Sequence, residues 1–344
     1  MFDPDKCDLC GECRRRCLYI DHSEGTAARA MEELIQGGPG GVPPEWLRQC
    51  VTCFACNEYC PNDARPFDLV LERLEQLGDY VNPDLLPLAE QMFTPKTPFA
   101  PKPTGKVALS LCTIYPAIPW AFTGSLFDHL TPLKGTHFFC HLIYPHLGNE
   151  TKMREKLPDL LEKYAQLEAD TIVFAHDDCY AVMTDAVPRF GLELPFRPVH
   201  LYEYLRDELR RRKTEIRPLR MKVAYQRPCA SRLTPWKDSC LDEIFQLIGV
   251  DRVPRQYDRD NALCCGQDMK GVQNRGDKFP ALRTTNIADA AAHGAEAMAY
   301  LCPMCLDALF PVVREHGLAN YMVSDLCRLA LGETLPEDAY AAYR

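Results

Sequence analysis

The spacing of apolar residues divides the chain into a helical first part and a later part in which strands and helices alternate. Residues 26–38 are rich in Ala, Met, Glu and Leu and end in paired glycines, which predicts a helix and its stop. Residues 64–78 repeat apolar side chains near i, i+3, i+4 and i+7, which predicts a second helix. Beyond residue 105, short apolar runs alternate with helical stretches, and this pattern is typical of an α/β fold.

A proline-rich segment separates these two parts. Four prolines stand within nine residues, at positions 95, 98, 101 and 103, and this density predicts a stiff extended linker. We therefore expect an N-terminal domain over residues 1–92 and a linker over residues 93–105. Two α/β lobes should follow, over residues 106–218 and 219–344.

The two expected lobes repeat each other. Three pairs of segments correspond in order: 106–112 with 222–229, 137–141 with 262–266, and 171–179 with 297–305. In the first and third pairs an apolar strand pattern ends at a cysteine. Because open α/β sheets bind ligands at the carboxyl ends of their strands, we expect one site in each lobe.

Composition and charge exclude several classes of protein. Apolar residues make up 47% and charged residues 25% of the chain, which is ordinary for a globular protein. The net charge of −9 argues against a nucleic-acid partner. No apolar run reaches the ~18 residues of a transmembrane helix, and no hydrophobic signal region begins the chain. We therefore expect a cytoplasmic protein without a membrane span.

Cysteine is the unusual feature of the composition. The chain contains 18 cysteines, and many of them stand at C-x-x-C spacings. A secreted disulfide framework would explain the number, but a signal peptide is lacking. Clustered C-x-x-C spacing in a cytosolic protein favours metal binding or redox chemistry instead.

Two copies of the run C-x2-C-x2-C-x3-C lie near the N-terminus. Three cysteines at this pitch bind three corners of one [4Fe–4S] cluster, and the fourth ligates the other cluster. Zinc also accepts C-x-x-C ligands, but two complete four-cysteine runs favour iron–sulfur clusters. The predicted ligands form a first N-terminal set, Cys7, Cys10, Cys13 and Cys60, and a second N-terminal set, Cys50, Cys53, Cys56 and Cys17.

With its motifs placed between helices, the first part of the chain resembles a known domain. It is similar to the α-helical ferredoxin domain of succinate dehydrogenase iron–sulfur subunits and of the heterodisulfide reductase C subunit. The resemblance covers about residues 1–85. It implies two cubane clusters close enough together to form a short path for electrons.

The second lobe carries a five-cysteine pattern, C-x34-C-C-x36-C-x2-C. It resembles the cysteine-rich CCG domain of the heterodisulfide reductase B and D subunits. The resemblance implies that the five cysteines hold a non-cubane [4Fe–4S] cluster made of two fused smaller units. Gly266 should let the backbone pass close to the metal. The alternative is that the adjacent cysteines are small buried hydrophobes. The five residues are Cys229, Cys264, Cys265, Cys302 and Cys305; Cys240 and Cys327 lie outside the pattern and are expected in helix cores.

The first lobe departs from that pattern, because histidines replace two of its five cysteines. Three hypotheses compete for the site. A zinc ion suits a set of cysteines and histidine, and a modified iron–sulfur cluster with a histidine ligand has precedent in Rieske-type centres. The third hypothesis is an empty lobe that shapes a substrate cleft, where a histidine supplies protons. The candidate ligands are Cys112, Cys140, His141, His176 and Cys179.

Nearly the whole chain resembles a fusion of the heterodisulfide reductase C and B parts, as in the D protein of that family. The expected fold is α+β and multidomain: an N-terminal α-helical ferredoxin domain followed by two tandem α/β CCG-type lobes. The resemblance implies an oxidoreductase subunit of anaerobic metabolism, active only within a complex, that passes electrons through two cubanes to a non-cubane cluster and a disulfide or thiol substrate.

The alternative is a relay that only transfers electrons between a flavoprotein and a quinone, as in lactate, glycolate or glycerol-3-phosphate oxidising complexes. No flavin or dinucleotide fingerprint is visible, so partner subunits should bring electrons. The expected partner is a flavoprotein, a membrane quinone-reactive subunit, or both. Through such a partner the chain would lie peripherally at the inner face of the membrane.

Overall fold

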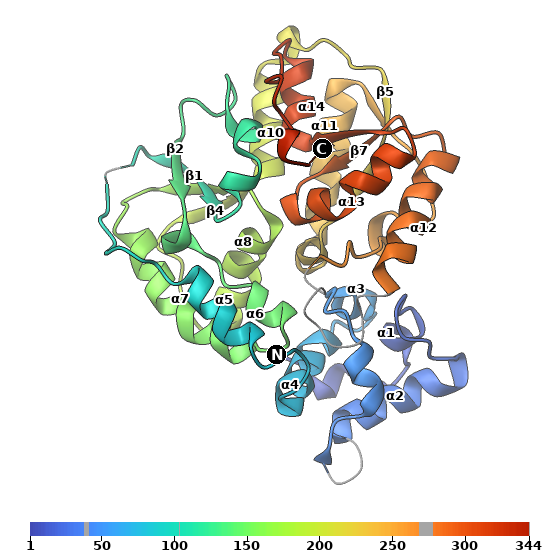
Figure 1. Ribbon diagram of the computed structural model, residues 1–344. Helices are drawn as coiled ribbons and strands as arrows, with labels where there is room; N and C mark the ends of the chain where they lie inside the picture. Colours follow the sequence, from blue (N-terminus) through green and yellow to red (C-terminus); the bar gives the residue numbers. More distant parts are fainter. Residues whose placement is uncertain (38–40, 103, 268–277, 344) are drawn as a thin grey trace. The chain divides into compact units, whose positions relative to one another are not determined.

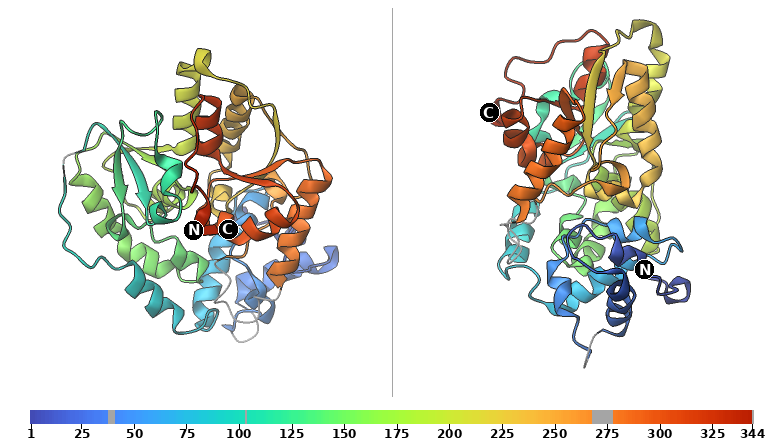
Figure 2. Two further views of the ribbon diagram at one scale, coloured as in Figure 1. Left: turned by 45° about the horizontal axis from the view of Figure 1, so that its top comes forward. Right: turned by 90° about the vertical axis from the view of Figure 1, so that its right-hand side faces the viewer.

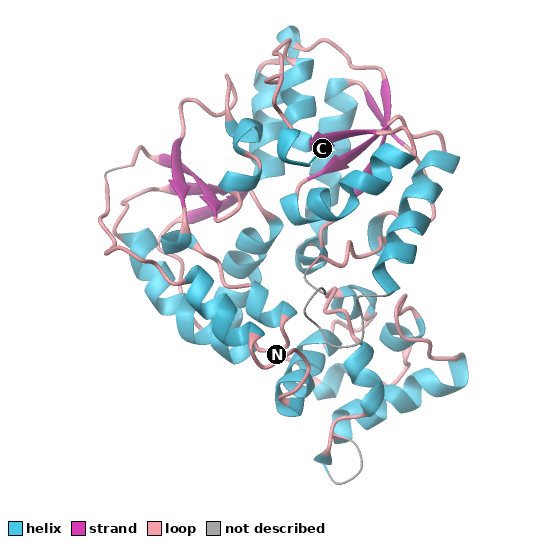
Figure 3. Ribbon diagram, viewed as in Figure 1, coloured by secondary structure: helices cyan, strands magenta, loops and turns pink. Residues whose placement is uncertain are grey.

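Helices dominate the first part of the chain and two parallel sheets dominate the second (Figures 1 and 3). The computed structural model describes residues 1–37, 41–102, 104–267 and 278–343. A helical unit is built mainly from Met1–Phe93 and His141–Pro158, and an α/β unit from Thr94–Cys140, Asp159–Gln267 and Phe279–Arg344. The predicted α+β multidomain fold is thereby confirmed. The domain boundaries stay a prediction, and Pro103 of the linker lies outside the described residues.

The helical unit contains the two helices that the apolar spacing predicts. They are α2 (Glu24–Gln36), which stops at Gly37 in the left-handed conformation, and α4 (Pro66–Leu77). Gly11 precedes α1 with φ +72°, and a Cβ there would lie 2.5 Å from the backbone nitrogen of Ala28, so glycine allows this close approach to α2. The other helices here are α1 (Glu12–Arg15), α3 (Ala55–Tyr59), α5 (Leu85–Phe93) and α6 (Ile143–His146); α7 (Glu150–Ala165) begins in this unit.

Each lobe of the α/β unit is built on a four-stranded parallel sheet. The strand orders are β2-β1-β3-β4 and β6-β5-β7-β8, so both sheets have the same topology and the predicted repeat is confirmed. In each sheet the two central strands are the ones that the cysteine-ended segments predict. The strands are β1 (Val107–Cys112), β2 (Thr131–Lys134), β3 (Thr171–Phe174), β4 (Arg197–His200), β5 (Met221–Gln226), β6 (Val250–Arg252), β7 (Ala297–Tyr300) and β8 (Ala319–Met322).

Helices of both lobes share one hydrophobic core. α10 of the first lobe packs against α11 and α14 of the second (Figures 1 and 2). Cys240 on α11 and Cys327 on α14 are buried in this core, as expected. The helices are α8 (Asp177–Ala181), α9 (Val187–Arg189), α10 (Leu201–Arg211), α11 (Asp238–Ile248), α12 (Lys278–Ala292), α13 (Pro303–Glu315) and α14 (Val323–Ala330). In the part of the chain that the structure describes, no helix combines the length and apolarity needed to span a bilayer.

Candidate metal centres

Cysteines gather at the carboxyl ends of the central strands of both sheets. Cys112 ends β1, and Cys179 lies on α8, shortly after β3. In the second lobe Cys229 begins a 3-10 turn after β5, while Cys302 caps α13 and Cys305 lies in its first turn after β7. β1 and β3, like β5 and β7, are neighbours. Their ends form the switch point at which open α/β sheets bind ligands.

The five cysteines of the second lobe lie together, and we call them the five-cysteine set. The Sγ atoms of Cys229 and Cys264 are 3.5 Å apart. Contacts with Cys264 and Cys305 hold the pKa of the Cys265 thiol well below its usual range. Cys302 contacts Cys305 in turn. Within the set, Cys229 and Cys264 are partly exposed and the other three are buried, so the set has one accessible edge.

This donor set fits an iron–sulfur cluster. Five converging thiol groups offer the soft ligands that iron–sulfur clusters take. The backbone N–H of Gly266 lies 3.3 Å from the Cys264 sulfur. Gly266 has φ +70°, and a Cβ there would lie 1.9 Å from the ring of Phe279. Glycine is therefore the residue that fits beside the adjacent cysteines.

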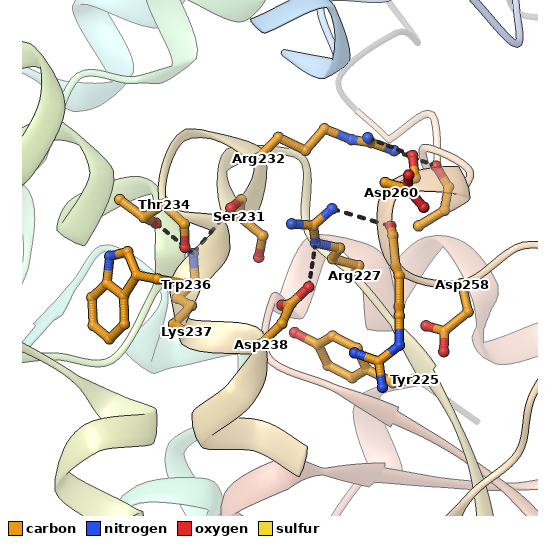
Figure 4. A network of polar contacts seen from close by, with 12 residues as sticks. Tyr225, Arg227, Ser231, Arg232, Thr234, Trp236, Lys237, Asp238, Asp258 and Asp260 are labelled. Atoms are coloured by element: carbon orange, nitrogen blue, oxygen red, sulfur yellow. Dashed lines mark hydrogen bonds and ion pairs between the residues drawn. The ribbon is translucent and has the colours of Figure 1, made fainter. Parts of the chain in front are cut away.

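Side chains flanking Cys229 hold the segment that leads into Cys264 (Figure 4). Arg227 donates to the carbonyl oxygen of residue 259 at 3.1 Å, and Gln226 donates to that of residue 263 at 2.8 Å. Arg232 donates to the carbonyls of residues 260 and 262, at 2.8 and 2.7 Å. We call residues 259–263 the clamped segment. These bonds fix Cys229 relative to the adjacent cysteines.

A buried polar network joins the two lobes between their cysteine sites. The Asp177 carboxylate accepts from Lys237 Nζ at 2.8 Å, from Ser231 Oγ at 2.6 Å and from His200 Nε2 at 3.0 Å. Burial alone would raise the pKa of Asp177, but Lys237 and His200 bring it far below its usual range. The carboxylate is therefore charged. Asp177 stands two residues before Cys179, and Ser231 two residues after Cys229.

His200 should make the α/β unit less stable in mild acid. Its Nδ1 accepts the Tyr202 N–H at 3.1 Å and caps α10, so the ring is neutral. Burial lowers the pKa of His200 to about 4, below the ordinary ~6.5. The unfolded chain therefore binds the proton first, and stability falls as the pH drops below 6.5.

We expect His200 to contribute a loss of about 1.5 kcal/mol between pH 6.5 and pH 5. Urea unfolding at the two pH values would measure it. The His200→Gln variant should lose this part of the pH dependence, because glutamine does not titrate. An equal slope in the variant and the parent would contradict the assignment.

Three cysteines of the first lobe form a compact buried group, which we call the three-cysteine group. The sulfur atoms of Cys112, Cys140 and Cys179 all lie within 4.8 Å of one another. In the chain as described, no histidine nitrogen belongs to this group. His141 starts the second segment of the helical unit, and its ring stacks on Tyr144 with 5.9 Å between centroids.

His176 lies beside the five-cysteine set of the other lobe. Burial would lower its pKa, but Asp178 and Cys302 raise it to about 10. Nδ1 lies 3.6 Å from the Asp178 carboxylate, and Nε2 is buried. The structure thus brings three of the five predicted first-lobe ligands together and places this histidine next to Cys302.

Two of the N-terminal cysteines, Cys13 and Cys56, have other predicted cluster ligands as neighbours. Burial raises the pKa of the Cys13 thiol, Arg14 lowers it, and Cys60 and Cys7 raise it further. Burial likewise raises the pKa of the Cys56 thiol, and the nearby Cys13, Cys17 and Cys50 raise it further. The crossing of Cys17 and Cys60 stays a prediction, and these neighbours support it.

Comparison with known proteins finds iron–sulfur and cysteine-rich domains in this chain. A family model described as a 4Fe-4S dicluster domain matches residues 6–65, and one described as a cysteine-rich domain matches residues 223–309. The chain is 21% identical to the D subunit of the dihydromethanophenazine:CoB–CoM heterodisulfide reductase of Methanosarcina barkeri, over 89% of this chain and 88% of that relative. It is 22% identical to the D subunit of the reductase of the same name from Methanosarcina acetivorans, over the same shares.

The fold, the cysteine sets and these matches define an iron–sulfur protein of the oxidoreductase class. More particularly, the chain combines a 4Fe-4S dicluster domain with a cysteine-rich CCG domain and is similar to the heterodisulfide reductase D subunit over 89% of its length, the resemblance that the sequence predicted. Its relatives are subunits of a reductase, so the comparison also supports a role within a complex.

Proposed function

We propose that the chain is the disulfide-reducing component of a heterodisulfide reductase-type complex. The two N-terminal sets would hold [4Fe–4S] cubanes, and the five-cysteine set a non-cubane [4Fe–4S] cluster. There a disulfide takes up two electrons and two protons and leaves as two thiols. The observation that carries the proposal is the convergence of five thiols, with Cys229 and Cys264 at an accessible edge.

The chain's own residues prepare this edge for a sulfur substrate. Arg227, Arg232 and Gln226 fix the clamped segment, so Cys264 and Cys265 are held in place. Gly266 keeps the backbone close to the sulfur of Cys264. When bound, the cluster would supply electrons and an iron site for sulfur. Electrons would come from a flavoprotein or membrane quinone-reactive partner, with the chain in the cytoplasm at the inner membrane face.

One observation favours the alternative of a relay that makes no product. Cys265, Cys302 and Cys305 are buried, and a relay needs a cluster that no substrate reaches. The two functions differ in whether a sulfur compound binds at the five-cysteine set. An experiment that detects such binding therefore distinguishes the disulfide reductase from the relay.

A thiol or disulfide should perturb the electron paramagnetic resonance spectrum of the five-cysteine cluster alone. Cys265→Ser should abolish this response and turnover with partner subunits, because it removes a central sulfur of the set. Both N-terminal clusters should stay reducible by dithionite. Cys240→Ser is the matched control, since it alters a buried cysteine outside the set. Turnover of Cys265→Ser at the parent rate, or an unresponsive parent spectrum, would favour the relay.

We further propose that the three-cysteine group holds one zinc ion, with His141 or His176 as fourth ligand. Three buried cysteine sulfurs at this spacing suit tetrahedral zinc, which binds them as thiolates. Anaerobically purified protein should contain about one zinc and about 12 iron atoms, four for each cluster. Cys140→Ser should remove the zinc and leave the iron. About 16 iron atoms without zinc would mean a fourth cluster, and about 12 iron atoms without zinc would mean an empty lobe.

The fourth zinc ligand can be found in the same way. His141→Gln or His176→Gln, whichever replaces the ligand, should lower the zinc content, and the other should not. His176 lies next to Cys302, so its variant should also be examined for a changed spectrum of the five-cysteine cluster. Unchanged zinc in both variants would leave the fourth position to a non-protein ligand.

A further inference from the structure

Arg14 is a buried cation among the N-terminal cysteines. It is 1% exposed, although its neighbour Arg15 on the same turn has an exposed side chain that pairs with Glu12. Arg14 Nη2 donates to the Cys56 sulfur at 2.5 Å. Its guanidinium carbon also lies 5.5 Å from the centroid of the Trp46 ring. The side chain is therefore held in one position within the helical unit.

The charge of Arg14 is not balanced by a carboxylate in the described parts of the chain. Its ion-pair and hydrogen-bond contacts contain no Asp or Glu, and its Nε has no hydrogen-bond partner there. A buried cation without a partner is strongly destabilising. Burial would lower the pKa of Arg14, but Cys56, Cys13, Cys17 and Cys50 raise it above its usual range. The hydrogen bond to the Cys56 sulfur thus takes the place of a carboxylate partner.

The position of Arg14 is asymmetric between the two N-terminal sets. Of the four cysteines that most raise the pKa of Arg14, three are predicted to belong to the second set, Cys56, Cys17 and Cys50. Only Cys13, its neighbour in sequence, belongs to the first. The guanidinium also interacts with the Cys13 sulfur, but its hydrogen bond at 2.5 Å goes to Cys56. Arg14 is therefore directed at the second set.

The asymmetric position of Arg14 should raise the reduction potential of the second cluster more than that of the first. Reduction adds one negative charge to an iron–sulfur cluster, and a nearby fixed cation stabilises that charge. Hydrogen bonds to the ligand sulfurs and the net charge are known determinants of the reduction potential. Arginine keeps its charge at every physiological pH, and burial limits screening by salt. The effect on the second cluster should be the larger one.

We propose that Arg14 makes the cluster of the second N-terminal set the more easily reduced of the pair, so that an electron within the helical unit settles on it. The inference rests on the proposed function, since it requires both sets to hold clusters. Arg14 would therefore determine which of the two clusters holds the added electron, without touching a substrate. It also gives electron flow between the two clusters a preferred direction.

The test is a dithionite titration followed by electron paramagnetic resonance, on the full chain with its clusters. The signal of the second cluster is the one that Cys53→Ser alters. In Arg14→Gln, the equilibrium constant for electron transfer from the first to the second cluster should fall at least tenfold, or about 59 mV. Arg15→Gln is the matched control, because it removes the same charge from an exposed position on the same turn.

The possible outcomes separate the inference from the proposed function. Less than a threefold change in Arg14→Gln with full iron, or an equal change in Arg15→Gln, would overturn the inference. If Arg14→Gln loses iron, Arg14→Lys replaces it; the charge remains but the planar donor group is lost. A fall of less than tenfold is then expected, because the charge is kept. A parent protein in which the first cluster is reduced before the second would overturn the inference whichever variant is used. Iron missing from the parent protein would instead refute the proposed function.

Discussion

Replacing Lys237 by methionine should lower the free energy of unfolding of the α/β unit by about 3–5 kcal/mol. Methionine has a similar length and fills the same space, but it leaves the Asp177 carboxylate charged and buried without its ammonium partner. Both side chains are fully buried, so water does not compensate for the loss. Lys237 also donates to the Thr234 hydroxyl at 2.6 Å (Figure 4). Urea unfolding followed by tryptophan fluorescence measures the change.

The control for Lys237→Met is a pair on the surface. Arg210 and Glu243 form an ion pair whose side chains are 53% and 31% exposed. Arg210→Met should therefore cost less than about 1 kcal/mol. Samples need equal metal content, because Ser231 and Asp177 lie two residues from Cys229 and Cys179. A loss below about 1 kcal/mol in Lys237→Met would show that the network carries no buried charge.

Gly266→Ala should abolish the cluster of the five-cysteine set. The added Cβ would overlap the Phe279 ring, whose nearest atoms would lie 1.9, 2.2 and 2.5 Å away. The left-handed backbone at φ +70° adds strain. Gly266 directly follows Cys264 and Cys265. A backbone shift that relieves the overlap would therefore move these two cysteines away from the other three cysteines of the set. Iron content should fall by about four atoms per chain, and the N-terminal clusters should keep their spectra.

Two variants give this prediction its control. Gly294 has φ +79°, but a Cβ there meets nothing within 4 Å, so Gly294→Ala tests backbone strain alone. Its iron content should stay at the parent value. Adding Phe279→Ala to Gly266→Ala should restore part of the missing iron, since it removes the obstructing ring. Full iron in Gly266→Ala would show that the segment tolerates the shift.

Regular spacing is the part of the structure that could be predicted. The helices α2 and α4 follow from apolar periodicity, and the central strands β1, β3, β5 and β7 follow from apolar runs that end near cysteines. The outer strands were not predicted. β2 has four residues, TPLK, and β6 has three, VDR. Neither sequence alternates apolar with polar residues or forms a continuous apolar run. Pairing with a central strand, rather than local preference, makes them strands.

Several features of the sites depend on contacts between residues that are distant in sequence, and these features could not be predicted. Arg14 and Arg15 are adjacent arginines, and nothing in the run of basic residues shows which one is buried. Lys237 meets Asp177 across 60 positions of sequence. His176 aligns with a first-lobe ligand position, yet its ring lies beside Cys302 because the two lobes pack together. Only around Cys229 does the sequence itself point to such contacts, because two arginines, Arg227 and Arg232, stand within three residues of the cysteine.

The bonds to the clamped segment bear on how the protein is assembled in the cell. They come from side chains of the same lobe and involve no metal. The loop that receives the cluster can therefore reach its shape during folding, before iron and sulfide are supplied. The biosynthetic machinery would then meet a folded recipient and approach it from the side of Cys229 and Cys264, the two partly exposed cysteines of the set. Maturation of this centre would then be an insertion step, separate in time from synthesis of the chain.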